Sequence, residues 1–144
     1  MRNFHPSRQA QIALVSAYRP ERTLKENGDA SYQLAAQLRA ANLQFDVCRG
    51  FWEGKEEQSF AVDLGEAGNA GDVYATVERL AREYQQDAIG HVDAQGLFYV
   101  DWLQDTRDEL IGAWRELAEG AALPQGYTIF PSGRVYYAEP IKGA

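Results

Sequence analysis

Four residues that could do chemistry together lie within a short stretch in the middle of the chain. They are Phe51, Trp52, Glu56 and Glu57. Alternating apolar residues predict strands over 45–52 and 58–64, and Gly54 between them predicts a tight turn. Such a hairpin brings two aromatic rings close to two carboxylates. That combination suits a small molecule that is cationic and partly apolar.

Cysteine and histidine are scarce, which limits the other kinds of catalytic site. The single cysteine, Cys48, excludes an intrachain disulfide and a metal site built from several cysteines. Its position in a predicted strand indicates a small buried hydrophobic residue rather than a nucleophile. His91 falls in a strand-like run and is interpreted as structural, and His5 lies in a polar N-terminal arm. We therefore expect no metal, no cofactor and no Ser-His-Asp hydrolase site.

The composition indicates one globular domain with an acidic surface. The chain has 144 residues, of which 45% are hydrophobic, and a formal net charge of -7. This balance disfavours nonspecific nucleic-acid binding, which needs basic residues, but it does not disfavour a cationic ligand. No apolar run approaches the roughly 20 residues of a membrane span, and residues 1–11 lack the apolar segment of a signal peptide. We expect a cytoplasmic protein that binds neither nucleic acid nor membranes.

The order of predicted elements up to residue 92 is strand, helix, strand, strand, helix, strand. Asn27 or Asp29 is expected to cap the first helix and Asp72 the second. A glycine-rich connection without a P-loop pattern precedes the second helix. This order is typical of a ferredoxin-like βαββαβ core, an α/β sandwich with both helices on one face of an antiparallel sheet. The predicted segments are 12–18, 29–41, the hairpin at 45–64, the connection at 65–71, 72–85 and 88–92.

The remaining residues are expected to extend that core. A strand at 97–100 pairs back on the strand before it as a hairpin. Thr106 and Glu109 have the spacing of a capping box, and apolar residues at helical intervals predict a third helix that ends at Gly120. A Pro-Ser-Gly turn predicts a final hairpin. We expect a single domain made of an N-terminal arm (1–10), the core (11–92) and a C-terminal extension (93–144).

Five segments that cover most of the chain carry a family resemblance. They are LVSAYRP at 14–20, LAAQLRAA at 34–41, RGFWEG with EEQSFAV at 49–62, VERLAREYQQDAI at 77–89 and GAALPQGYTIFPSGRVY at 120–136. In this order they resemble the phage-encoded S-adenosylmethionine hydrolases, which have been reinterpreted as S-adenosylmethionine lyases. The resemblance implies an α/β sandwich that assembles as a homotrimer with active sites between subunits. Apolar residues of one sheet face, of the C-terminal hairpin (Tyr127, Phe130, Tyr136 and Tyr137) and of the strand at 97–100 also favour a trimer, because two helices cannot cover them.

The resemblance further implies a reaction and roles for individual residues. The implied reaction cleaves S-adenosylmethionine into 5'-methylthioadenosine and L-homoserine lactone, which depletes this methyl donor in a host cell and counters restriction and methylation. The family's functional acid after the hairpin turn matches Glu57, with Glu56 as the neighbouring alternative, and a second acid matches Asp87 beside Gln86. The family's hairpin tyrosine falls on Trp52, which can stack but lacks the hydroxyl. The expected contacts on the adenosine side are Ser16, Ala17 and Tyr18.

Lactone formation suits these residues because the substrate's own carboxylate attacks Cγ and a neutral thioether leaves, without proton transfer. The protein would bind a folded conformer and exclude water. Glu57 can accept bonds from the ribose hydroxyls, and Trp52 or Tyr18 can attract the sulfonium or stack on adenine. Three alternatives stay open. They are a hydrolase in which Glu57 activates water, a non-enzymatic trimeric regulator that binds an adenine nucleotide, and a protein-binding mimic with an acidic surface.

Overall fold

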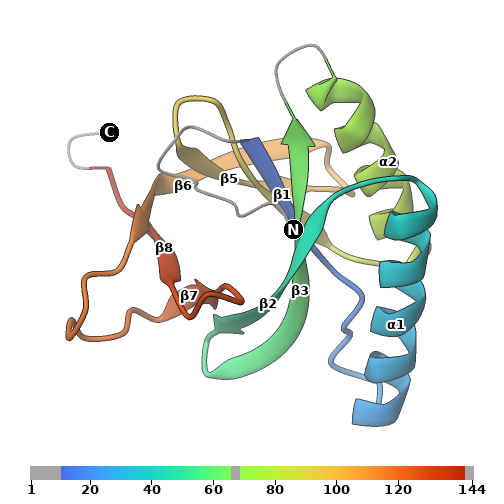
Figure 1. Cartoon of the computed structure of the whole chain (residues 1–144), viewed down its shortest axis with the longest axis horizontal. Helices are drawn as coiled ribbons and strands as arrows, with labels where there is room; N and C mark the ends of the chain where they lie inside the picture. The colour runs from blue at the N-terminus through green and yellow to red at the C-terminus, as the bar shows by residue number, and fades with distance from the viewer. Residues whose placement is uncertain (1–10, 66–68, 142–144) are drawn as a thin grey trace.

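Ten elements are arranged as a closed barrel of eight antiparallel strands with two helices along one side (Figure 1). The structure is a computed structural model that describes residues 11–65 and 69–141. The strands are β1 (Gln11–Ser16), β2 (Phe45–Trp52), β3 (Lys55–Gly65), β4 (Ala88–Val92), β5 (Leu97–Trp102), β6 (Arg107–Glu116), β7 (Gly126–Ile129) and β8 (Val135–Glu139). The helices are α1 (Leu24–Ala40) and α2 (Ala70–Glu83). Around the barrel the strand order is β1-β3-β2-β7-β8-β6-β5-β4, and β4 pairs with β1 to close it.

The predicted ferredoxin-like α/β sandwich is wrong, because the sheet does not stop after four strands. From β4 it continues through β5, β6, β8 and β7 and returns to β2, where residues 49–52 pair with residues 126–129. Residues 93–144, expected as an extension of a complete core, thus supply four of the eight strands. Local patterns predict strands and hairpins. The β2–β7 pairing joins distant segments, and no local pattern specifies it.

The predicted third helix is also wrong, because strand β6 occupies most of that segment. Its apolar residues fit helical spacing, but Gly112 in the middle disfavours a helix. In the strand, Gly112 lets the chain pass close to the end of β8, since a Cβ there would lie 2.2 Å from the Glu139 carbonyl oxygen. Thr106 lies in the β5–β6 turn with a φ of 50°, and so it is not a helix cap.

Both other helices form near their predicted positions, but neither begins at its predicted cap. α1 begins after Thr23, whose hydroxyl accepts a hydrogen bond from the Glu26 amide at 3.1 Å. The Glu26 carboxylate accepts one from the Thr23 amide at 2.9 Å, and the two bonds form a capping box. Asn69 is the N-cap of α2, and Asp72 lies in the first turn, where a negative charge suits the helix dipole.

The strand and hairpin predictions hold where they rest on alternation and turn residues. β2 spans the predicted residues 45–52, and its link to β3 is a two-residue turn in which Glu53 and Gly54 have φ values of 50° and 79°. β3 begins directly after this turn, which places Glu56 and Glu57 in the strand. The β4–β5 and β7–β8 hairpins are present as well. The N-terminal arm with His5 lies outside the described residues, as does part of the glycine-rich connection.

Two apolar clusters stabilise the fold, one on each side of the barrel wall. The outer cluster packs residues of the two helices, such as Leu38 and Leu80, against Phe60 of β3. The inner cluster includes Trp114, Phe130 and Tyr136. An eight-stranded barrel is just wide enough for side chains to fill, so its interior is a core and not a channel. Phe130 and Tyr136 are 6% and 2% exposed, so these two cannot supply the apolar surface that was expected to favour a trimer, whereas Tyr127 and Tyr137 of the same hairpin are half-buried.

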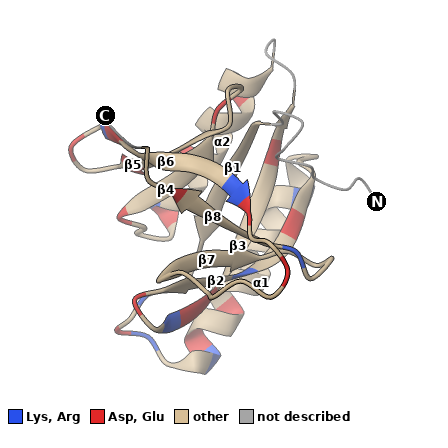
Figure 2. Ribbon diagram, turned by 90° about the vertical axis from the view of Figure 1, so that its left-hand side faces the viewer, with Lys and Arg blue, Asp and Glu red and all other residues tan. Residues whose placement is uncertain are grey.

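Acidic and basic residues are distributed over both helices and the strands (Figure 2). On the helices several form pairs one turn apart, and such pairs each add only about 0.2–0.5 kcal/mol to helix stability. These pairs are Lys25–Asp29, Arg79–Glu83 and Arg82–Glu78. Neither α1 nor α2 has the length and apolar character needed to cross a membrane.

Candidate active site

The end of β1 is tied to the neighbouring strand by the buried hydroxyl of Ser16. Its Oγ donates to the Gln58 carbonyl at 2.8 Å and accepts a bond from the Tyr18 amide at 3.0 Å. Ser16 is 5% exposed, while Tyr18 is half-buried. The two bonds therefore fix the direction in which the chain leaves the barrel.

A buried side chain of α1 holds the next residue of this loop. The Asn27 amide oxygen accepts a bond from the Arg19 amide at 2.9 Å, and its amide nitrogen donates to the Arg19 carbonyl at 3.1 Å. Asn27 was expected as a helix cap, but its two bonds act on the β1–α1 loop instead. Arg22 adds a third tie, because its guanidinium donates to the Ala17 carbonyl at 3.0 Å. Sequence reasoning missed Arg19 and Arg22, and only their place in a polar loop after a strand pointed to them.

The loop before β4 joins this segment from the other side. Gln86 donates from Nε2 to the Tyr18 carbonyl at 3.0 Å. The Arg19 guanidinium lies 3.7 Å from the Asp87 carboxylate, which is 76% exposed. Two segments far apart in the sequence, both predicted to contact substrate, are thus held together at one end of the barrel.

Glu57 lies on β3 beside the end of β1. In the β2–β3 ladder it is opposite Gly50, and it shares a strand face with Ser59, which pairs with Ser16. Although the residue as a whole is exposed, burial of its carboxyl group raises its pKa, and the neighbouring Ser16 side chain opposes this shift. Glu57 is therefore a carboxylate whose charge the protein solvates incompletely.

Glu56 points the opposite way. Its carboxylate lies 2.9 Å from the Arg49 guanidinium on the outer face of the hairpin, and this bond lowers the pKa of Glu56. The two neighbouring acids consequently have different surroundings. Of the two, only Glu57 lies with Ser16.

Trp52 covers the backbone of β7 at the tip of the β2–β3 hairpin. It pairs with Gly126, and a Cβ at that glycine would lie 2.3 Å from the Trp52 ring. The indole remains 58% exposed and shares its strand face with Gly50, which lies opposite Glu57. Trp52 thus lies on the same sheet face as Glu57, with its ring over β7.

The structure brings together most, but not all, of the predicted site residues. Those at one end of the barrel are Ser16, Tyr18, Glu57, Gln86 and Asp87. Ala17 is fully buried in the cluster beneath the helices, so its side chain does not reach the site. Gln86 and Ser16 already use hydrogen bonds to hold the loops, which is a positioning role. The arrangement can accept bonds from a polyol through Glu57 and stack a ring on Trp52.

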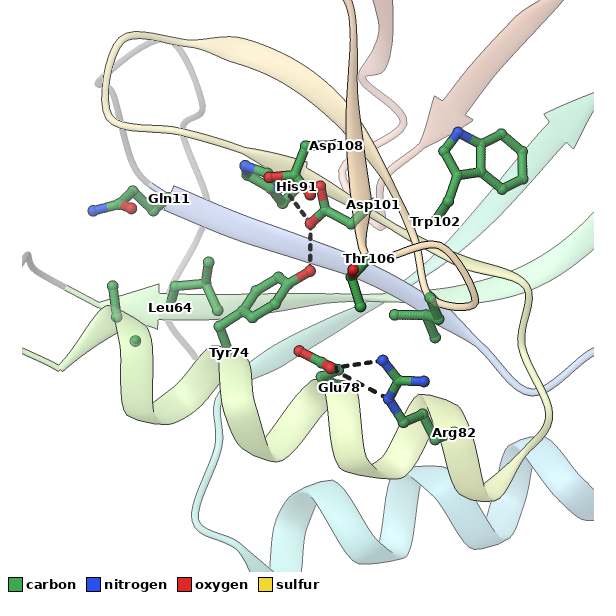
Figure 3. A pocket seen from close by; sticks show the side chains of 13 residues that line it. Gln11, Leu64, Tyr74, Glu78, Arg82, His91, Asp101, Trp102, Thr106 and Asp108 are labelled. Carbon is green, nitrogen blue, oxygen red and sulfur yellow. Dashed lines mark hydrogen bonds and ion pairs between the residues drawn. The ribbon is translucent and has the colours of Figure 1, made fainter.

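A separate pocket of about 370 Å³ lies between α2 and the barrel wall (Figure 3). Its lining includes Tyr74, His91, Asp101 and Asp108, and none of the predicted site residues. His91 is held there by Asp101, with Nδ1 2.5 Å from Oδ2. The cluster joins residues of α2, β4, β5 and β6, and no sequence motif pointed to it.

Comparison with known proteins supports an assignment of the chain as a whole. The sequence pattern described as the S-adenosylmethionine lyase family matches residues 13–139, which include every described residue assigned to the site. A comparison with curated proteins gives no match. Because the family match covers most of the chain, the protein belongs to the S-adenosylmethionine lyase family and is an S-adenosylmethionine lyase.

Proposed function

We propose that the reaction is an intramolecular cleavage of S-adenosylmethionine into 5'-methylthioadenosine and L-homoserine lactone. The observation that carries the proposal is the family match over residues 13–139. The placement of Glu57 beside Ser16, on the same sheet face as Trp52, is compatible with it.

In this reaction an oxygen of the substrate's carboxylate forms a bond to its own Cγ. The Cγ–sulfur bond breaks, and its electron pair stays on sulfur, which leaves as a neutral thioether. Atoms and charge balance without water, and no proton moves in the bond-breaking step. The protein therefore has to select a folded substrate conformer and keep water away from Cγ.

The proposed roles follow from the surroundings of each side chain. Glu57 accepts hydrogen bonds from both ribose hydroxyls, which replace the water that burial has removed from its carboxylate. Trp52 stacks on the adenine or lies against the sulfonium. Asp87, held by Arg19 but exposed, attracts the cationic end of the substrate.

Isotope labelling tests the reaction type. The purified protein would be incubated with S-adenosylmethionine in H₂¹⁸O and the products analysed by mass spectrometry. We expect unlabelled lactone, and any homoserine formed later by ring opening should carry ¹⁸O in its carboxyl group. A label on the Cγ hydroxyl would instead identify a hydrolase that activates water. No turnover, with binding retained, would favour the non-enzymatic regulator.

We also propose a homotrimer with active sites between subunits, and two measurements test it. Sedimentation velocity should give a single species of three chains, and a monomer at working concentration would contradict it. Glu57→Gln and Asp87→Asn proteins, if each is inactive alone, would then be mixed after dissociation and reassembly. Recovered activity supports sites made from two chains, whereas no recovery places both residues in one chain's site.

The proposed cellular role is depletion of the methyl donor. A cell that expresses the protein should contain less S-adenosylmethionine and show undermethylated DNA at its restriction sites. The Glu57→Gln protein, expressed to the same level, is the control. Equal methylation in both strains would contradict this role.

A further inference from the structure

We propose that the pocket between α2 and the barrel wall is a second ligand site, separate from the candidate active site, that binds the ammonium group of a small organic cation. Its volume of about 370 Å³ lies within the range of roughly 300–1,000 Å³ that is usual for small-molecule sites. Three walls come from separate elements, with Tyr74 on α2, His91 on β4 and Asp101 on β5.

Asp101 is the buried anchor of this pocket. Its side chain is 8% exposed, and its Oδ2 accepts a hydrogen bond from the Tyr74 hydroxyl and lies 2.5 Å from His91 Nδ1 (Figure 3). The other oxygen, Oδ1, is buried and has no hydrogen-bond partner. A buried carboxylate oxygen without a donor costs free energy. The pocket therefore contains an acceptor that a ligand can satisfy.

A second carboxyl group lies next to this free acceptor. Asp108 is opposite Asp101 in the β5–β6 ladder, and the two carboxyl groups lie side by side (Figure 3). Partial burial and the neighbouring Asp101 raise the pKa of Asp108. Two adjacent carboxyl groups repel each other when both are ionised, so they hold either a shared proton or a cation between them. An ammonium group, with three donors, can bond to both.

The other lining residues favour an organic cation over a metal ion. Glu78 is paired with Arg82, whose Nη2 lies 3.0 Å from its carboxylate, so the acceptors left for a ligand on this wall are Asp101 Oδ1 and the Asp108 carboxylate. Among residues 11–65 and 69–141 no group of three or more His, Cys, Asp or Glu side chains is arranged to hold a metal. The aromatic face of Tyr74 can instead contact an apolar chain and attract its ammonium head.

An NMR titration tests the proposal with butylamine as the probe and butan-1-ol as its uncharged counterpart. At constant ionic strength and neutral pH, butylamine should shift the side-chain signals of His91 and Tyr74 in a saturable way, and butan-1-ol should not. Asp108→Asn, which leaves the buried Asp101 bonds in place, should weaken butylamine binding at least about tenfold. Glu119→Gln, an exposed residue outside the pocket with the same change in charge, should bind like the wild type.

Four results would overturn the inference. They are the absence of saturable shifts, equal binding of butan-1-ol, equal binding of butylamine to Asp108→Asn, and displacement of butylamine by an equal concentration of magnesium chloride.

Turnover of S-adenosylmethionine tests whether this pocket is separate from the candidate active site. Asp108→Asn should degrade S-adenosylmethionine at the wild-type rate, and a matching loss of turnover would place the pocket in the active site instead. Because turnover and butylamine binding are measured separately, a failure of one is distinguishable from a failure of the other.

Discussion

The guanidinium of Arg19 lies 3.7 Å from the carboxylate of Asp87, and this pair joins the loop after β1 to the loop before β4. Arg19 also donates to Glu21 at 2.7 Å and to the Gln85 carbonyl. An exposed pair of this kind adds little to stability. Its effect is positional, because both loops carry residues proposed to bind the substrate.

Glu57→Gln should slow S-adenosylmethionine degradation at least about tenfold. The substitution removes charge-assisted bonds to the ribose, each worth about 1.5–3 kcal/mol. Formation of 5'-methylthioadenosine, followed by liquid chromatography, measures the effect. Glu56→Gln is the matched control, since its carboxylate bonds to Arg49 on the other strand face, and it should remain active. If the two variants exchange behaviour, Glu56 faces the substrate.

The same two variants should also differ in stability, and here Glu57→Gln, the less active variant, should be the more stable one. Burial raises the pKa of Glu57, so the ionised carboxylate is disfavoured in the folded state, and stability falls as pH rises from the unfolded value through the folded pKa. Above that range Glu57→Gln should melt at a higher temperature than the wild type. The pKa of Glu56 is lowered, and Glu56→Gln should gain nothing. A lower melting temperature for Glu57→Gln would mean that its charge is fully stabilised in the free protein.

Two glycine substitutions should separate the barrel from the site. A Cβ at Gly112 would lie 2.2 Å from the Glu139 carbonyl oxygen, which belongs to the backbone of β8, whereas a Cβ at Gly126 would meet the movable ring of Trp52 at 2.3 Å. Gly112→Ala should therefore cost about 1–3 kcal/mol or more in urea unfolding. Gly126→Ala should cost less but displace Trp52 and weaken substrate binding. Equal stability losses would contradict this distinction.

Asp101→Asn should destabilise the protein by about 1–3 kcal/mol at neutral pH, because Tyr74 and His91 lose a charged partner. The pKa of Asp101 is lowered, although burial alone would raise it, since bonds from His91 and Tyr74 outweigh that burial. Its contribution is thus present above the unfolded pKa of about 3.9 and is lost as pH falls through the folded value. Urea unfolding of both proteins at several pH values should show the difference shrinking below pH ~4. A constant difference would contradict the assignment to ionised Asp101.

Cys48 should react with a thiol reagent only when the protein unfolds. The side chain is fully buried inside the barrel, and burial raises the pKa of its thiol to about 12. Since the thiolate is the reactive form, labelling in native buffer should follow global unfolding, and urea should accelerate it. Rapid labelling of the native protein would show that the barrel opens locally at β2.

The elements that sequence patterns predict well are those fixed by neighbouring residues. β2, the turn at Gly54 and the β7–β8 hairpin follow from alternation and turn residues. The closure of the barrel does not, because the ladder between residues 49–52 and 126–129 depends on the shape of the whole sheet. β6 was mistaken for a helix because its apolar residues fit helical spacing, whereas Gly112 disfavours a helix and lets the strand pass close to β8.

The candidate site divides in the same way. The resemblance named Glu57 and Asp87, but their common location depends on β1 lying between β3 and β4, which puts the ends of three strands together. The opposite faces of Glu56 and Glu57 follow from strand alternation. The cluster of Tyr74, His91 and Asp101 could not be predicted, since it requires α2 to pack against β4 and β5.

The closed strand order has a consequence for how copies of this chain can meet. Among the described residues each of the eight strands pairs with a neighbour on both sides, so no strand is free along its whole length for strand addition from another molecule. Contacts between copies can then be made by side chains, and exposed apolar residues such as Trp52 and Leu123 are available for them. Introducing like charges at such a contact should dissociate an assembly into folded single chains. Subunit dissociation and unfolding would accordingly be two separable transitions in this protein.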